Sequence, residues 1–494
     1  MKKAKLYIVL ILIIILLIGC DKGEALGIDT LIDTSINIDQ DNINQYKIQV
    51  EIDEENKSYK GKQWTTYVNN TSMTLEEVYF HIYPNAFKSL ETAPIIFDQT
   101  YENPLSYIGG FIDIINVSSS NKNLEYMIMG EDETLLYIKL DKLILPNDRV
   151  DLYLEYSVEL PSSKDRFGYG DRVINGGNWY PIACVYDEDG WNLEPYYKIG
   201  DPFYSDISNY KIEMVTSKDT IIASSGNVLT EEIKDDKKTR QIEGKLIRDF
   251  AWVASKEFKI KEVMVENTMV KLFYLDTKSF LIKQSLDVAA ESIRIFNRVF
   301  GAYPYGQYSI VMTEFPSGME YPGLVFVSND YYLYSMRDIL EQVIVHETAH
   351  QWWYGIVGSN QVKEAWLDEG LTTYSESIYY KEAYGDKIGE DYFNKNVREG
   401  YEYGEKYYLG SELNINKHLK EFSGWNEYGI LVYLKGAMFI NQIKEDYGEA
   451  VLDEIFEKYF STNKFNNATT EDFIKVCEEV TGDSFDKIIN EWLN

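Results

Sequence analysis

The chain has few cysteines and no hydrophobic run long enough to cross a membrane comfortably. Three cysteines stand in 494 residues. They define no disulfide framework, although one bridge between Cys184 and Cys477 stays open. The unbroken apolar run over 6–18 has thirteen residues, whereas a membrane-spanning helix needs about 20. No internal repeat or low-complexity tract stands out.

Positive charge is also scarce. The chain has 48 Lys and Arg residues against 80 Asp and Glu residues, which gives a formal net charge of −32. This balance argues against nucleic acid as a partner. It would also repel an anionic bilayer, so attachment to a membrane has to come from a lipid and not from a basic patch. The length and the 45% hydrophobic content suffice for two or three domains with substantial cores.

The N-terminus has the features of a secretion signal. Three lysines precede the apolar run, which suits the core of a signal peptide over 1–19. Leu17-Ile18-Gly19-Cys20 resembles the bacterial lipobox, in which the signal is cut before a cysteine that then carries lipid. We therefore expect an extracytoplasmic, membrane-anchored lipoprotein with lipid at Cys20 and a polar tether over 20–43. An uncleaved anchor and an ordinary secretion signal remain alternatives.

The first half of the chain predicts a β-rich domain, over 44–262. From Tyr46 to about Phe258, short runs of alternating apolar and polar residues are separated by turn residues, as in half-buried strands. Aromatic clusters in this half indicate core packing in preference to a ligand site. His81 lies in one of the alternating runs, and nothing marks it as a ligand.

The second half predicts a mainly helical domain, over 263–494. Turn residues gather at 315–323. Thr469 and Asp472 have the spacing of a helix-capping pair, and His418 lies in a charged loop where we expect it to be solvated. Apolar spacing predicts strands over 308–312 and 324–327, and helices over 279–300, 338 to about 356, through Glu369 to about 383, 428–447, 449–459, 470–480 and 484–493.

The segment His346-Glu347-Thr348-Ala349-His350 is an H-E-x-x-H motif. Residues four apart share one face of a helix, so both imidazoles can bind one metal ion, with Glu347 beside it as a base for water. Glu369, nineteen residues after His350, would add a carboxylate from a second helix. Two nitrogens and one oxygen leave a fourth position open, which is the catalytic zinc pattern. A helix of structural histidines is the alternative, but it would not require Glu369.

These features resemble the gluzincin aminopeptidases, the family of aminopeptidase N and leukotriene hydrolase. Gly318-Met319-Glu320 resembles the middle of the family's G-x-M-E-N exopeptidase motif, and 432–437 resembles its V-Y-E-K-G-A segment. Ser317 and Tyr321 stand where the motif has glycine and asparagine, and Asp368 stands where the family has another polar residue. The resemblance runs from about residue 44 to the end, and we expect the large helical domain that many members append to be absent.

The resemblance implies an α+β fold, in which a saddle-like β-rich domain is followed by a thermolysin-like, mainly helical zinc peptidase domain. It implies an aminopeptidase with one Zn²⁺ per chain that acts on peptides with free N-termini. Tyr433 would stabilise the oxyanion, and Gly318, Met319 and Glu320 would bind the substrate, with Glu320 on its ammonium group.

Two residues are weaker candidates for the surroundings of the site. Glu376 lies seven residues after Glu369 on the same helical face and could orient an imidazole ligand, although a solvated glutamate there would look the same. Tyr428 resembles a second family tyrosine near the site, with core packing as the alternative. For the whole chain, a zinc endopeptidase or another hydrolase, and a catalytically silent surface binding protein, remain alternative functions.

Overall fold

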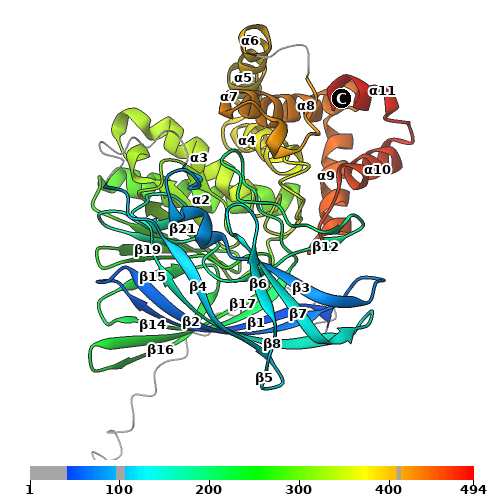
Figure 1. Cartoon of the computed structure of the whole chain (residues 1–494). Helices are drawn as coiled ribbons and strands as arrows, with labels where there is room; N and C mark the ends of the chain where they lie inside the picture. The colour runs from blue at the N-terminus through cyan, green and yellow to red at the C-terminus, as the bar shows by residue number, and fades with distance from the viewer. Residues whose placement is uncertain (1–41, 96–105, 409–412, 494) are drawn as a thin grey trace, which may run out of the picture.

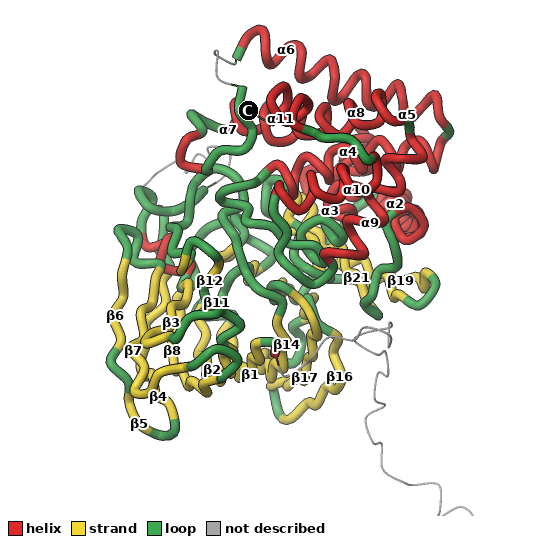
Figure 2. Tube along the Cα trace, turned by 90° about the vertical axis from the view of Figure 1, so that its right-hand side faces the viewer, coloured by secondary structure: helices red, strands yellow, loops and turns green. Residues whose placement is uncertain are grey.

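The computed structural model describes residues 42–95, 106–408 and 413–493. Strands fill the lower part of the molecule in Figure 1 and helices the upper part, and the turned view shows the same separation (Figure 2). The structure therefore has the predicted fold class, α+β with a β-rich first half and a mainly helical second half. The predicted signal peptide, Cys20 and nearly all of the tether lie outside the described residues. Among the described helices, none has the length and apolar character that a membrane span requires.

The first half is built on an eight-stranded sheet that has β1 near its centre. Residues Ile48, Val50 and Ile52 of β1 are buried and alternate with polar residues on the other face, as the sequence pattern predicts. Strand β1 runs parallel to β14 and antiparallel to β2. In order, the strands are β16 (Asn227–Lys234), β17 (Lys237–Ile247), β14 (Ser208–Ser217), β1 (Asn44–Asp53), β2 (Ser58–Val68), β8 (Arg149–Glu159), β4 (Phe111–Ser119) and β5 (Lys122–Asn123).

Two smaller sheets and a hairpin complete the first half. One sheet has the order β15 (Ile221–Ser224), β18 (Trp252–Ser255), β10 (Ile174–Gly176) and β9 (Phe167–Tyr169). The other has the order β11 (Ile182–Ala183), β3 (Leu75–His81), β7 (Leu135–Ile144) and β6 (Tyr126–Met129). The hairpin pairs β12 (Tyr186–Asp187) with β13 (Gly190–Trp191). A short 3₁₀ helix, η3 (Tyr83–Lys88), follows β3.

A five-stranded sheet begins the second half and carries one of the predicted substrate segments. Its order is β19 (Lys259–Val265), β20 (Thr268–Tyr274), β21 (Gln307–Thr313), β23 (Leu324–Ser328) and β22 (Gly318–Met319). Strands β20, β21 and β23 are parallel, and every residue of β21 and β23 is buried, as in sheets covered on both faces. β22 folds back antiparallel at the edge, which places Glu320 directly after it.

The helices follow the predicted order and differ from the prediction at three places. One of these is the predicted helix over 428–447, which is divided into α7 (Trp425–Tyr428), a π-helical segment over Gly429–Lys435 and α8 (Gly436–Tyr447). The metal helix α3 covers Arg337–Ala349 and ends seven residues earlier than predicted, since the backbone continues in tight turns in which Gln351 N donates to Thr348 O and Trp352 N to Ala349 O. The helices α5 (Asp386–Phe393) and α6 (Glu399–Tyr407) were not predicted. The others are α2 (Ser279–Val299), α4 (Trp366–Tyr384), α9 (Glu449–Asn463), α10 (Thr470–Thr481) and α11 (Asp486–Trp492).

Three local predictions can be compared with the structure. Thr469 and Asp472 form the capping box at the start of α10. The prediction that His418 is solvated is wrong, because its ring lies 3.1 Å from a Glu194 oxygen and edge-on to Tyr197. Cys184 and Cys477 are both buried free thiols, so no bridge joins them.

Candidate active site

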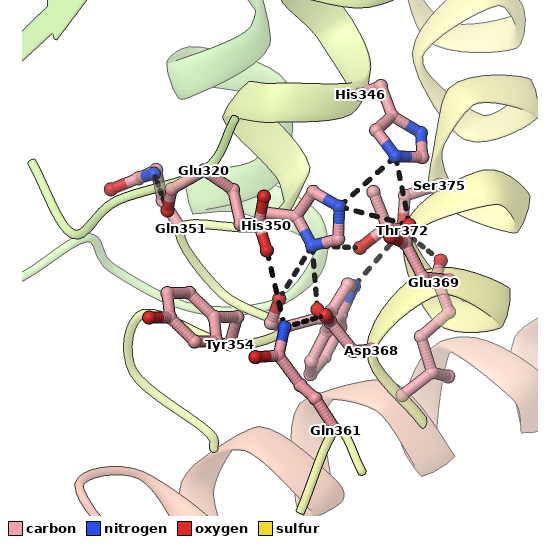
Figure 3. A network of polar contacts seen from close by, with 12 residues as sticks. Glu320, His346, His350, Gln351, Tyr354, Gln361, Asp368, Glu369, Thr372 and Ser375 are labelled. Atoms are coloured by element: carbon pink, nitrogen blue, oxygen red, sulfur yellow. Dashed lines mark hydrogen bonds and ion pairs between the residues drawn. The ribbon is translucent and has the colours of Figure 1, made fainter. Parts of the chain in front are cut away.

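The three predicted metal ligands come together from two helices. His346 and His350 lie one turn apart at the end of α3, and Glu369 lies in the first turn of α4. The two Nε2 atoms are 3.1 Å apart, and Glu369 Oε2 lies 3.1 Å from His346 Nε2 and 3.3 Å from His350 Nε2 (Figure 3). In a tetrahedral zinc site with bonds of about 2.0–2.2 Å, neighbouring ligand atoms lie about 3.3–3.6 Å apart. The observed triangle is therefore close to the size that zinc requires.

The outer nitrogens of both imidazoles bind carboxylates. His346 Nδ1 lies 2.7 Å from Glu376 Oε1, and His350 Nδ1 lies 2.7 Å from Asp368 Oδ1. A carboxylate oxygen can only accept a hydrogen bond, so each Nδ1 carries a hydrogen and donates it, and in the neutral imidazoles both Nε2 lone pairs then face Glu369. Two lone pairs and a carboxylate at 3.1–3.3 Å repel one another unless a positive charge lies between them. The donor set thus fits a divalent cation.

The electrostatics of His346 and Glu369 show the same demand for positive charge, which a proton meets when no metal ion is bound. Burial works against charge on His346, but its contacts with Glu369 and Glu376 outweigh burial and raise the pKa of His346 to about 10. Burial likewise opposes charge on Glu369, yet the two imidazoles hold its pKa below the ordinary value. The ligand cluster therefore attracts positive charge.

Glu347 points into the same pocket without a partner for one of its oxygens. Its side chain is buried, and within the described residues Oε2 has no hydrogen-bond donor. Burial is the main cause that raises the pKa of Glu347 to about 7. Gly318 makes room for it, because a Cβ atom there would lie 1.9 Å from Glu347 Oε1. A buried carboxylate with a free oxygen and a pKa near neutrality is suited to take a proton from water.

Tyr433 reaches the site from an irregular helical segment. Residues Gly429–Lys435 form a π-helix between α7 and α8, and such wide turns often occur at functional sites. The Tyr433 hydroxyl donates a hydrogen bond of 2.6 Å to Glu369 Oε1, and its ring lies parallel to that of His346. Tyr428, which is buried, packs edge-on against Tyr433, so the structure places it behind Tyr433.

Glu320 faces the pocket from the edge of the five-stranded sheet. One oxygen of Glu320, one of Glu347 and a ring nitrogen of His350 all lie within 4.8 Å of one another. Glu320 Oε1 accepts a hydrogen bond of 3.2 Å from Gln361 Nε2. Burial is the main cause that raises the pKa of Glu320. Two acids in a buried corner beside the metal ligands can offset the charge of one ammonium group.

The β-rich half contributes residues to the pocket that the sequence did not reveal. Arg166 and Asp201 are both buried, and their side chains form an ion pair at the pocket wall. Arg166 Nε also lies 3.0 Å from the sulfur of Met319, the residue before Glu320. The pocket has a volume of about 220 Å³ and is lined by Arg166, Asp201, Phe315, Ser317, Gly318, Glu320, Gln342, Val343, His346, Glu347, His350, Glu369, Glu376, Trp425 and Tyr433.

Two further contacts near the histidines were also missed. Gln361 donates to both Asp368 and Glu320 and so connects the two acids (Figure 3). Asp368, which stands where the family has another polar residue, is the partner of His350 Nδ1. Its position directly before Glu369 was the available signal, since the first turn of a helix can direct two acids to one neighbouring helix.

Comparison with known proteins agrees with this geometry. Residues 284–492 match the peptidase family M1 domain. The chain is 23% identical over 259 residues to Aminopeptidase 2 of Candida albicans, which covers 50% of this chain and 27% of that protein. It is 24% identical over 228 residues to Aminopeptidase N of Lactobacillus helveticus, which covers 42% of this chain and 26% of that protein. The matches thus span only about a quarter of these curated relatives.

Solved structures share the fold over almost the whole chain. An M1 zinc metallopeptidase from Deinococcus radiodurans superimposes with a TM-score of 0.65 at 15% identity, covering 92% of this chain and 94% of that one. A mutant of that enzyme bound to the substrate Tyr-Ser-Ala superimposes with a TM-score of 0.64 at 13% identity and the same coverage. Residues 284–492, which match the peptidase family M1 domain, carry every ligand of the candidate zinc site, and this match confirms the resemblance to the gluzincin aminopeptidases.

Proposed function

We propose that the protein is a zinc-dependent aminopeptidase that binds one Zn²⁺ per chain and removes N-terminal residues from peptides. The observation that carries this proposal is the joint geometry of the pocket. Three ligand atoms form a triangle of 3.1–3.3 Å, and two buried carboxylates, Glu347 and Glu320, face the same pocket.

The chain's own side chains supply the steps of hydrolysis. Zinc bound by His346, His350 and Glu369 would polarise the scissile carbonyl and lower the pKa of the attacking water. Glu347 takes a proton from that water and later passes it to the leaving amine. The Tyr433 hydroxyl turns its hydrogen from Glu369 toward the carbonyl oxygen as negative charge develops there.

Glu320 supplies the preference for N-terminal residues. The free ammonium group of a peptide would bind the Glu320 carboxylate in a buried corner, where a charge-assisted hydrogen bond is stronger than in water. Asp201 adds a second acid to the same wall, although Arg166 already pairs with it. A blocked N-terminus or a mid-chain bond has no cation to offer, so Glu320 would remain unpaired and these substrates would bind weakly.

We further propose that the enzyme is held at the outer face of the membrane by lipid on Cys20. The support is the sequence: a short apolar run after three lysines, ending at Leu17-Ile18-Gly19-Cys20. The net charge of −32 would repel an anionic bilayer, so the lipid would have to supply the attachment. Mass spectrometry of the N-terminal peptide tests this, and an unmodified Cys20 thiol in membrane-purified protein would contradict it.

The exopeptidase assignment is tested with paired substrates. The same peptide amide is assayed with a free and with an N-acetylated N-terminus, on the wild-type chain and on Glu320→Gln. We expect the wild type to cleave the free form at least about 100-fold faster, and Glu320→Gln to lose most of that preference. Equal rates on both forms in the wild type would instead indicate an endopeptidase.

A second variant separates an enzyme from a silent binding protein. Glu347→Gln keeps all three metal ligands and removes the base. We expect it to retain zinc while its turnover falls by at least about 100-fold. Turnover unchanged in Glu347→Gln would show that this carboxylate is not the base.

A further inference from the structure

The end of the large sheet at which the described chain begins has an unusual surface. Two loops meet there, 69–74 after β2 and 143–147 at the end of β7. We call these two segments the uncharged tip. Neither segment contains a charged residue, although 26% of the chain is charged. Three of its side chains are large, apolar and exposed: Met73 at 53%, Leu143 at 60% and Leu145 at 52%.

The uncharged tip is built rigidly. Asn69 is fully buried, and its side-chain nitrogen donates to the carbonyls of Met73 at 2.8 Å and Ile144 at 3.0 Å. Asn147 N donates to Asn69 O, and Asn69 N donates to Asp148 O. Because these bonds fix both loops to each other, the exposed Met and Leu side chains cannot fold back into the core.

The turns at the opposite end of the same sheet contain charged residues. The β1–β2 turn contains Glu54, Glu55 and Lys57, and the β16–β17 turn contains Asp235 and Asp236. Pairing of Ser217 with Lys237, and the hydrogen bond from Ser217 to Glu54, place these turns together. The turns at that end thus carry several charges, whereas segments 69–74 and 143–147 carry none, although Asp148 and Arg149 follow directly after the second segment.

The N-terminal segment leaves the sheet at the uncharged tip. Asn70 Nδ2 donates a hydrogen bond of 2.9 Å to the carbonyl of Asn42, the first described residue, and Asn44 accepts one from Val68 N. The 41 residues before it include the apolar run and Cys20. Any attachment through Cys20 therefore joins the described chain at the uncharged tip, 22 positions further along the sequence.

We propose that Met73, Leu143 and Leu145 contact the phospholipid bilayer and orient the enzyme on it. This rests on the proposed membrane attachment. Uncharged polar loops with apolar side chains suit the headgroup boundary, whereas the acidic remainder of the surface is repelled by anionic lipids. Three side chains add only modest affinity, which is sufficient because the N-terminal segment keeps them at high effective concentration. A second copy of the chain is a poor alternative, since stable interfaces involve about 20–30 residues a side.

Depth-sensitive quenching tests the proposal on the full chain reconstituted in vesicles. A thiol-reactive, environment-sensitive dye is attached at Leu143→Cys, and at Ile233→Cys as a matched control. Ile233 is 61% exposed on β16, at the charged end of the sheet. Cys184 and Cys477 are buried, so the dye reacts at the introduced cysteine. The vesicles are phosphatidylcholine and phosphatidylglycerol, with bromine on the acyl chains of half the phosphatidylcholine.

We expect bromine to quench the dye at position 143 at least about twofold more than the dye at position 233. Adding Leu145→Asp should abolish the difference while leaving the thermal unfolding midpoint unchanged, because the side chain is exposed. Equal quenching at both positions would overturn the proposal. So would a blue shift at position 143 that appears without vesicles and grows with protein concentration, since that indicates a second copy.

Failure of the lipid anchor can be recognised separately. Dye uptake by the wild-type chain would reveal a free thiol at Cys20 and contradict lipid modification. In that case both dye-labelling variants are made with Cys20→Ser, which keeps the apolar N-terminal run, so the dye again reacts at the introduced cysteine and the quenching comparison tests the uncharged tip.

Discussion

At the scale of single residues, the site depends on acids that do not touch the metal. Glu376 and Asp368 each accept a hydrogen bond from the Nδ1 atom of one histidine at 2.7 Å. They fix the ring orientation and keep the proton away from the nitrogen that binds metal. The predicted roles of His346, His350 and Glu369 therefore need two further residues to hold.

Glu376→Ala and Asp368→Ala should each weaken zinc binding by about 10–100-fold, because the imidazole then loses the partner that fixes its tautomer. Competition with a chromogenic chelator measures this. Glu382→Ala is the matched control: it lies on the same helix α4, but its carboxylate pairs with Arg298 at the surface. Zinc affinity that falls equally in all three variants would contradict the assigned roles.

His81 gives the molecule a pH dependence outside the active site. Burial lowers the pKa of His81 from 6.5 to about 4, against the opposing influence of Asp132 and Glu194. Between those values the unfolded chain binds a proton that the folded chain does not. The folded protein therefore has its full free energy of unfolding, as far as His81 is concerned, above pH 6.5. As the pH falls toward 4, this free energy decreases by up to about 3 kcal/mol.

His81→Phe keeps a ring that can stack on Tyr83 and removes the titration. We expect the variant to lose less stability than the wild type between pH 6.5 and pH 4, whatever its stability at neutral pH. Thermal unfolding midpoints across this range show the difference. Parallel curves for the two proteins would mean that His81 does not titrate as described.

At the scale of elements, two helices must approach closely to bring Glu369 to the histidines. Gly370 on α4 packs against Gly436 at the start of α8, where a Cβ atom on Gly370 would lie 2.9 Å from the Gly436 Cα. The π-helix before Gly436 carries Tyr433. A glycine pair therefore sets the distance between the helix that carries Glu369 and the segment that carries Tyr433.

Gly370→Ala should force α4 and α8 apart, costing about 1–3 kcal/mol of stability and also weakening zinc binding through the neighbouring Glu369. Gly429→Ala is the matched control, because a Cβ atom there meets nothing within 4 Å, and we expect it to be neutral or stabilising by about 0.5–1 kcal/mol. Thermal unfolding measures the stability of both variants, and zinc titration measures their affinity for the metal. The prediction fails if Gly370→Ala behaves like Gly429→Ala.

Comparison of the elements with the sequence shows which of them local spacing predicts. Period-two and helical spacing predicted β1, β21, β23 and most helices, because those patterns are local. The predicted helix through about residue 356 runs past the observed end at Ala349, and the segment beyond it is held by the other half of the chain, where Arg248 Nε donates to the Tyr354 carbonyl. Pocket residues Arg166 and Asp201 carry no local motif at all. Their position depends on how distant strands pair, which spacing along the chain does not encode.

At the scale of the whole molecule, the pocket belongs to both halves. Arg166 from the β-rich half pairs with Asp201 and contacts Met319 beside Glu320. All three residues are buried. The substrate wall is thus completed only when the two halves pack together.

Arg166→Met should lower stability by about 3–5 kcal/mol, because it leaves Asp201 buried without its partner. Adding Asp201→Asn removes the unpaired charge, so the double variant should regain a substantial part of the loss. Thermal unfolding of the wild type and both variants gives the comparison. A double variant less stable than Arg166→Met would show that Asp201 is stabilised by something other than Arg166.

The central claim is that side chains from α3 and α4 hold one catalytic zinc ion. Elemental analysis of purified wild type, Glu369→Ala and Glu347→Gln tests it most directly. We expect about one zinc per chain in the wild type and in Glu347→Gln, and strongly reduced zinc in Glu369→Ala, which removes one of three ligands. A wild-type chain without zinc, or a Glu369→Ala variant that binds zinc as the wild type does, would contradict the account.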